Sequence, residues 1–211
     1  MGYDYLKSGQ DIYDLSFARV RSKTDLGHVP SELESLIVRL VHAVGMPDIV
    51  KDIKFDNGLY QAAMSAFAAK APILCDCDMV FHGITKRFLP DDMPVKSYIT
   101  EADLPALAQK MGTTRSAAQI TYWADELEGA IVAIGNAPTA LFYLLEVMEK
   151  TGVRPACILG FPVGFVGASE SKEALISDHG TVPYITLRGT RGGSALAAAA
   201  VNALALEARA Q

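Results

Sequence analysis

Hydrophobic residues occur along the chain in short continuous runs and in longer stretches with helical spacing. The short runs predict buried strands over Ile73–Cys75, Val95–Ile99, Ala130–Ile134, Ala156–Leu159 and Tyr184–Leu187. The longer stretches predict helices over Leu59–Ala69, Leu104–Lys110, Arg115–Leu127, Thr139–Lys150, Glu170–Ile176 and Ser194–Ala208. Short apolar strands separated by helices are typical of parallel β-α-β units. We therefore predict a three-layer, doubly wound α/β fold, with a mainly parallel sheet and helices on both faces.

The clearest amphipathic helix is predicted over Ser31–Val44. Its leucine, isoleucine and valine residues share one face, whereas Arg39 and His42 fall on the other. Ser31 and Glu34 have the spacing of a capping box, in which the serine caps the helix and the glutamate bonds back to it. This helix is expected to bury one side and to present Arg39 and His42 on the other.

Length and charge limit the classes of function. With 211 residues and 50% hydrophobic content, the chain fits one domain over 1–211, with a helical amino-terminal segment of about 1–71. The formal charge of -5 and the isoelectric point near 5.4 give no overall attraction to nucleic acid or to anionic membranes. A nucleic-acid partner is therefore not expected, and an anionic ligand needs a local cluster of arginine and lysine.

The cysteine count and the apolar segments indicate the cellular compartment expected for the protein. The chain has three cysteines, an odd number that does not suggest a disulfide framework. Its first residues are too polar for a secretory signal, and the alanine-rich stretch 195–205 is too short to cross a bilayer. We therefore expect a cytoplasmic protein without a membrane partner.

His42 is the strongest candidate for proton transfer, because a histidine near its ordinary pKa gains or loses a proton at cytosolic pH. The helical pattern alone favours a solvated histidine on a polar face. Ser16 and Arg21 lie in an earlier helical stretch, where the residues alone indicate only a hydroxyl and a surface charge.

Two glycine-rich loops follow predicted strands, and in α/β sheets ligands bind at the carboxyl ends of strands. The first spans 160–172 and ends in Lys172, and the second spans 188–194 and contains Arg191. Lys172 is either a point charge for a carboxylate or part of a solvated helix. Arg191 and the neighbouring glycines suit an anion cradle. Neither loop has a dinucleotide or phosphate-binding motif, so no nucleotide cofactor is expected.

Two further turns carry candidate polar groups. Arg115 follows a potential helix cap, Thr114, and Asn136 lies in a loop between a predicted strand and helix. Both turns also have a purely structural interpretation. The run 75–78 with His82 contains two cysteines and two aspartates, but its spacing fits no zinc pattern, and no metal is expected.

Several of these segments, in chain order, resemble the precorrin-8X methylmutase family of cobalamin biosynthesis. The resembling motifs are Ser-Phe-x-x-Val-Arg from Ser16, Arg-x-x-His-x-x-Gly from Arg39, Cys-Asp-x-x-Met-Val from Cys75, Gly-Asn-Ala-Pro-Thr-Ala-Leu from Gly135, Gly-Phe-Pro-Val-Gly-Phe-Val-Gly-Ala-Ser-Glu-Ser-Lys from Gly160 and Arg-Gly-Gly-Ser from Arg191. The resemblance covers roughly residues 16–204. At Lys23 the chain departs from the acidic residue that the family commonly carries shortly after the arginine of its first motif.

This resemblance implies an intramolecular reaction. A methyl group moves from ring carbon 11 to ring carbon 12 of precorrin-8X by a 1,5-sigmatropic shift, which gives hydrogenobyrinic acid without an external cofactor. His42 is then the catalytic proton donor or acceptor. The residues expected to bind the substrate are Ser16, Arg21, Arg39, Thr85, Arg115, Asn136, Lys172 and Arg191.

The resemblance also implies a homodimer with sites near the subunit interface, and neighbouring pathway enzymes are further candidate partners. Three alternatives stay open at this point. One is the cobalt-containing substrate of the anaerobic route, cobalt-precorrin-8. Another is a corrinoid carrier that binds without turnover, and the third is a nucleotide-dependent α/β enzyme.

Overall fold

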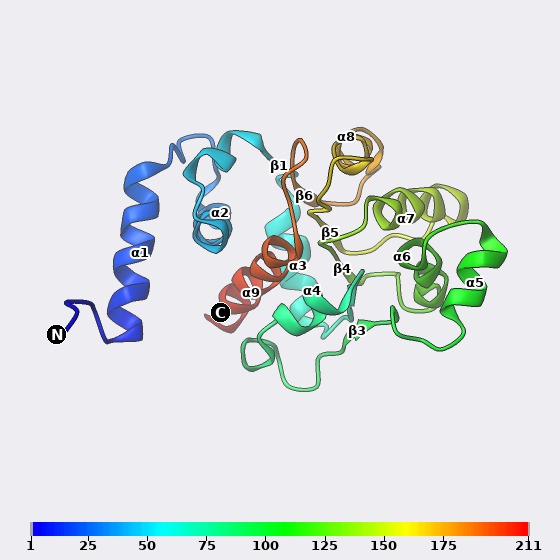
Figure 1. The fold of residues 1–211 in the computed structure, drawn as a ribbon, viewed down its shortest axis with the longest axis horizontal. Coiled ribbons are helices and arrows are strands. Elements are labelled where there is room, and N and C mark those ends of the chain that lie inside the picture. The colour runs from blue at the N-terminus through cyan, green and yellow to red at the C-terminus, as the bar shows by residue number, and fades with distance from the viewer. Residues whose placement is uncertain (1, 211) are drawn as a thin grey trace.

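A mixed sheet of six strands lies between two layers of helices in the computed structural model, which describes residues 2–210 (Figure 1). The strands are β1 (Ile53–Phe55), β2 (Ile73–Cys75), β3 (Val95–Ser97), β4 (Ile131–Ile134), β5 (Cys157–Gly160) and β6 (Tyr184–Leu187). Their order in the sheet is β1-β6-β5-β4-β2-β3, and only β1 runs antiparallel to its neighbour.

The helices are α1 (Gly9–Lys23), α2 (Ser31–Val44), α3 (Leu59–Ala68), α4 (Asp78–Gly83), α5 (Leu104–Met111), α6 (Arg115–Ala118), α7 (Pro138–Thr151), α8 (Ala168–Asp178) and α9 (Ser194–Ala210). Shorter 3-10 helices are η1 (Pro47–Asp52), η2 (Lys86–Phe88) and η3 (Gln119–Trp123). No helix within residues 2–210 is both long and apolar enough to cross a membrane.

Alternating side chains of the central strands enter two separate cores. Ile73 and Cys75 join the core under α2, α3, α4 and α9, whereas Leu74 between them joins the core under α7, α8 and η3. This alternation follows from the two-residue period of a strand. Both sheet faces are therefore covered by helices, and the predicted doubly wound α/β fold is confirmed.

The predictions missed α4, η1 and η2, and two further elements differ from them in an informative way. The segment predicted to be helical up to about residue 71 also supplies β1, a three-residue strand too short to show an alternating pattern. The predicted helix Arg115–Leu127 is wrong beyond Ala118, because the chain continues as the 3-10 helix η3. There the buried Gln119 amide donates to the Asp76 carbonyl oxygen at 2.6 Å, so a tertiary contact outweighs helix propensity.

The predicted boundaries of α2 are confirmed, but its predicted capping box is wrong. Pro30 occupies the cap position, and the Ser31 hydroxyl donates to the Glu32 carboxylate at 3.2 Å. Glu34 instead pairs with Arg21. At the other end Gly45 adopts a left-handed conformation with φ of 67°, and its N–H bonds to the Val41 carbonyl at 2.8 Å.

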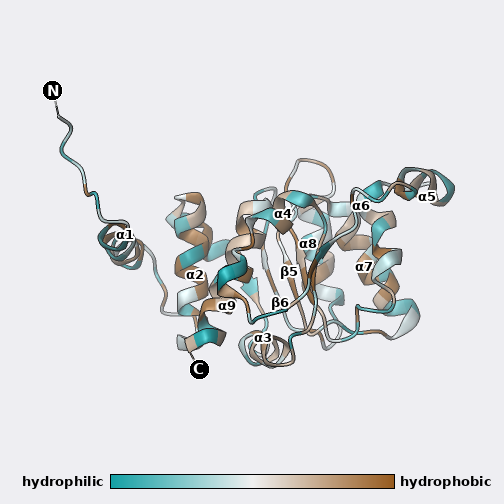
Figure 2. Ribbon diagram, turned by 90° about the horizontal axis from the view of Figure 1, so that it is seen from below, coloured by the Kyte–Doolittle hydropathy of each residue, from teal (hydrophilic) through white to brown (hydrophobic). Residues whose placement is uncertain are grey.

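Helix α1 stands at the edge of the molecule and crosses α2 at a steep angle (Figures 1 and 2). None of its residues is buried, and Ile12 and Leu15 are 46% and 39% exposed. The segment before α1 extends away from the body (Figure 2) and carries Tyr3 and Tyr5, which are also exposed. The chain therefore presents an unburied apolar surface at this end.

The carboxyl ends of the parallel strands meet at one edge of the sheet. Helices α4, α7, α8 and α9 begin there, because each follows such a strand. Because β1 is antiparallel to β6, the preceding η1 lies at the same edge, where the Arg188 N–H bonds to the Asp52 carbonyl at 2.9 Å. The carboxyl end of α2, which carries His42, leads directly into η1 and so lies near this edge.

Candidate active site

His42 and Ser16 form the centre of the candidate site. The Ser16 hydroxyl lies 2.8 Å from the Nδ1 atom of His42, which is a direct hydrogen bond between α1 and α2. His42 is exposed, and its Nε2 atom has no hydrogen-bond partner within residues 2–210. The contact fixes the ring through one nitrogen and leaves the other available for proton transfer.

Arg39 is held one turn away by aromatic rings of α1. Its guanidinium donates to the Tyr13 hydroxyl and lies 5.3 Å from the Tyr13 ring centre and 5.5 Å from that of Phe17. The Phe17 ring in turn lies 5.3 Å from that of His42. These cation–π contacts place a fixed positive charge beside the histidine.

Replacing Ser16 with alanine should reduce turnover by about 10-fold, because the imidazole loses the bond that fixes its orientation. The matched variant Ser16→Thr keeps a hydroxyl and should recover most of the rate. The pH dependence of kcat is the informative readout, since a purely structural serine would leave it unchanged. Equal pH profiles for the parent and Ser16→Ala would show that the hydroxyl does not act through His42.

Asp76 organises the loop after β4. Its side chain is fully buried and accepts hydrogen bonds from three consecutive backbone N–H groups, those of Gly135, Asn136 and Ala137, at 2.8, 2.9 and 2.8 Å. Burial raises the pKa of the Asp76 carboxyl, and the three N–H donors oppose that rise. The buried Asp76 carboxylate therefore holds in place the loop that carries the predicted ligand Asn136.

The role of Asp76 was missed by sequence reasoning, which considered this residue within a possible metal cluster and a family-like motif but gave it no function. A usable signal was present, because an acidic residue directly after a fully buried strand lies where loops meet. Its partners lie about sixty positions away, at Gly135 to Ala137, and no spacing within its own segment indicates them.

Arg115 and Asn136 are brought to neighbouring turns. Thr114 caps α6 by accepting from the Ala117 N–H at 3.1 Å, and its hydroxyl also lies 2.7 Å from that of Thr139 in α7. This pair connects the turn carrying Arg115 to the loop carrying Asn136. Both of these side chains are exposed, so they are available to a ligand.

The two glycine-rich loops pack tightly on each other. The Gly193 N–H bonds to the Phe161 carbonyl at 2.8 Å, and the Gly164 N–H bonds to the Thr190 carbonyl at 3.1 Å. A Cβ atom at Gly192 would lie 2.3 Å from the Pro162 carbonyl oxygen, so only glycine fits there.

The apolar tip of the first of these loops is left in solvent. Phe165 and Val166 are 94% and 89% exposed. They offer an apolar surface at the same edge of the sheet as the exposed polar groups.

Lys172 and Arg191, by contrast, are already paired inside the protein. The buried Lys172 ammonium donates to the Arg191 carbonyl oxygen at 2.6 Å. Burial, together with the nearby positive charge of Arg191, lowers the pKa of Lys172 to about 8. The Arg191 guanidinium bonds Asp48 and Asp52 at 2.6 and 2.7 Å. In this arrangement both residues join the second loop to α8 and η1, and ligand binding by either stays a prediction.

Arg21 and Thr85 bond to partners other than His42 and Ser16. The Arg21 guanidinium pairs with Glu34 at 2.7 Å on the exposed surface between α1 and α2. The backbone N–H of Thr85 bonds the Asn202 side chain of α9 at 2.8 Å. The structure therefore does not bring these two predicted ligands together with His42, and their roles as ligands stay predictions.

The cavity beside His42 is small. Its volume is 180 Å³, and its lining residues include Ser16, Val20, Lys23, His42 and Pro47. Pockets that enclose a drug-sized ligand usually measure about 300 to 1,000 Å³. The cavity of the single chain can therefore hold only part of a large ligand.

These features define an α/β protein with an exposed, oriented histidine and several polar loops at one edge of its sheet. The family model described as precorrin-8X methylmutase matches residues 11–207. The precorrin-8X methylmutase of Pseudomonas aeruginosa is 54% identical over 97% of this chain and 98% of its own. The cobalt-precorrin-8 methylmutase of Methanothermobacter thermautotrophicus is 34% identical over 96% of this chain and 92% of its own.

A solved structure gives the same result. The precorrin-8X methylmutase of Thermus thermophilus superimposes with a TM-score of 0.86 and 33% identity, over 95% of this chain and 96% of that one. The chain belongs to the precorrin-8X methylmutase family, whose members are isomerases of cobalamin biosynthesis.

Proposed function

We propose that this protein converts precorrin-8X to hydrogenobyrinic acid. The bond between the methyl group and ring carbon 11 breaks as a bond to ring carbon 12 forms, so the product has the same atoms as the substrate. The observation that supports this proposal most directly is the oriented imidazole of His42 in a chain of this family. An isomerisation of this kind requires orientation and one mobile proton, and it needs no hydride carrier or external methyl donor.

In this proposal the free Nε2 atom of His42 exchanges a proton with the conjugated macrocycle. Protonation of the ring system withdraws electron density and so favours migration of the methyl group, and the proton returns afterwards. Ser16 keeps the imidazole oriented through Nδ1. The positive charge of Arg39, held by the Tyr13 hydroxyl, suits a carboxylate arm of the same substrate.

The metal-free substrate is the better fit. The two relatives named precorrin-8X methylmutase that are reported from Pseudomonas aeruginosa and a Sinorhizobium species are 54% and 47% identical to this chain. The cobalt-precorrin-8 methylmutase described above is 34% identical.

When precorrin-8 is supplied separately with and without cobalt, the protein should turn over the metal-free form faster. A higher kcat/KM for the cobalt form would assign the protein to the anaerobic route, and binding without turnover would indicate a carrier.

We also propose that the working form is a homodimer. The 180 Å³ cavity at His42 is too small for a tetrapyrrole, and the exposed apolar residues Ile12 and Leu15 of α1 lack a covering surface within the described chain. A second copy of the chain would complete the wall of the cavity at His42 and would cover Ile12 and Leu15.

Light scattering at micromolar concentration should then give twice the chain mass of 22.6 kDa. The double variant Ile12→Asp with Leu15→Asp should shift the protein toward the single-chain mass. A parent protein that remains monomeric at assay concentration while turning over substrate would contradict the dimer.

A cytoplasmic location of the protein also stays a prediction.

A further inference from the structure

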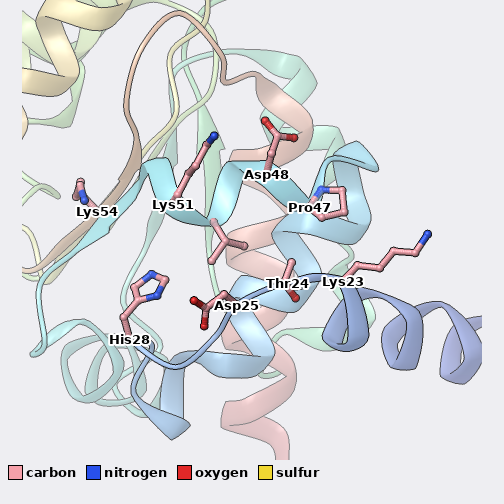
Figure 3. A pocket seen from close by; sticks show the side chains of 9 residues that line it. Lys23, Thr24, Asp25, His28, Pro47, Asp48, Lys51 and Lys54 are labelled. Carbon is pink, nitrogen blue, oxygen red and sulfur yellow. The ribbon is translucent and has the colours of Figure 1, made fainter.

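We propose that the cavity between α1, η1 and β1 is a second carboxylate-binding groove, which receives an acid arm of the tetrapyrrole whose ring lies at His42. This inference rests on the proposed function and extends its binding site. The cavity has a volume of 710 Å³ and is shown in Figure 3. Its lining residues are Lys23, Thr24, Asp25, His28, Pro47, Asp48, Val50, Lys51 and Lys54.

The uncompensated charge of this groove is positive. Within the described chain, the side chains of Lys23, Lys51 and Lys54 form no hydrogen bond or ion pair, although the charge of Lys51 contributes to the lowered pKa of the neighbouring Asp48 carboxyl. Lys96, by contrast, pairs with Glu126 at 2.6 Å. An unpaired lysine ammonium has three free donors and suits a ligand carboxylate.

The carboxylates that line the groove are already engaged. Asp48 is bonded by the Arg191 guanidinium at 2.6 Å, and Asp25 accepts from the Gly27 N–H at 3.0 Å. In Figure 3, the side chain of Lys51 extends away from Asp25, on the side where Asp48 lies. An acid arm that enters the groove would therefore meet lysine ammonium groups that no protein carboxylate binds directly, with only Lys51 near the charge of Asp48.

The groove adjoins the cavity at His42. Lys23 and Pro47 line both, so Lys23 forms a common wall between the proton-transfer site and the groove. The smaller cavity cannot enclose a tetrapyrrole, whereas the larger one falls within the size range of ligand pockets. A ring at His42 would thus direct its acid arms past Lys23 toward Lys51 and Lys54.

The test is the binding of hydrogenobyrinic acid, followed by its absorbance at 25 and 250 mM NaCl. The double variant Lys51→Gln with Lys54→Gln should raise Kd by about 10-fold at the lower salt concentration and by much less at the higher one. The matched control, Lys110→Gln with Lys150→Gln, removes the same charge from exposed positions at the ends of α5 and α7 and should change Kd by less than about 2-fold.

A second ligand separates the carboxylates from the ring. An analogue of hydrogenobyrinic acid with its carboxyl groups amidated should bind the parent and the Lys51→Gln, Lys54→Gln variant equally. Inorganic phosphate, added as a competitor of hydrogenobyrinic acid, should not raise the Kd of the parent as the lysine substitutions do. Equal Kd values of the parent and the groove variant for hydrogenobyrinic acid, or a loss of binding explained by a lower assembled mass, would overturn the groove.

The outcomes also separate this inference from the proposed function. A parent protein that binds hydrogenobyrinic acid through the lysines but does not isomerise precorrin-8X would support the groove and refute the enzyme. A parent that isomerises precorrin-8X while the groove variant has unchanged KM and kcat would support the enzyme and refute the groove.

Discussion

Replacing His42 with asparagine should reduce turnover of precorrin-8X by about 100-fold or more, because an amide cannot exchange a proton near neutral pH. Asparagine keeps a polar group that can still meet the Ser16 hydroxyl, so the orientation of α1 on α2 should persist. Binding of hydrogenobyrinic acid should change by less than about 3-fold, since the positive charges around the site are retained. Single-turnover absorbance measurements separate the two effects.

A matched control is available at His82, which is exposed at the end of α4 and packs edge-on against Phe81. The variant His82→Asn makes the same chemical change away from the candidate site and should turn over precorrin-8X at the parent rate. If His42→Asn retained the parent rate and pH profile, His42 would be only a solvated histidine, and the proton-transfer mechanism would be wrong.

The second large effect concerns stability. Replacing Asp76 with alanine should lower the free energy of unfolding by about 3–5 kcal/mol, because three backbone N–H groups lose their shared acceptor in a buried setting. Asp76→Asn keeps one acceptor oxygen and should fall between the parent and Asp76→Ala. Denaturation by urea, followed by circular dichroism, measures both differences.

The control for this change is Asp125→Ala, at an exposed position outside the sheet, which should alter the unfolding free energy by less than about 0.5 kcal/mol. We also expect Asp76→Asn to raise KM more than it lowers kcat, because the loop carrying Asn136 moves while His42 does not. A variant Asp76→Ala as stable as the parent would show that the buried carboxylate does not hold this loop.

The layers of the fold were predictable because each central strand is a short, fully apolar run and each covering helix has an apolar stripe. Strand β1 was not predictable, because three residues are too few to show a strand-like alternation of apolar and polar side chains. Its pairing also depends on β6, which lies more than 120 positions later. The 3-10 geometry of η3 was not predictable either. It depends on the Gln119 amide reaching Asp76, a tertiary contact.

The candidate site was predictable only in part. His42 and Arg39 stand out as polar residues opposite an apolar stripe, and the family resemblance gives them a role. The bond from Ser16 to His42 joins residues 26 positions apart on crossing helices, and only the folded chain reveals it. For the same reason, the sequence suggested a point charge for a carboxylate at Lys172 and an anion cradle at Arg191, whereas the fold pairs Lys172 with a carbonyl and Arg191 with two aspartates.

The most direct test of the central claim follows the methyl group itself. Precorrin-8X labelled with ¹³C in its ring-carbon-11 methyl group and with ¹⁵N in its ring nitrogens is mixed with unlabelled substrate and incubated with the protein. The account predicts a product with the ¹³C methyl on ring carbon 12 by NMR, and only fully labelled and unlabelled masses. Absence of product, or masses that show exchange of methyl groups between molecules, would contradict an intramolecular methylmutase.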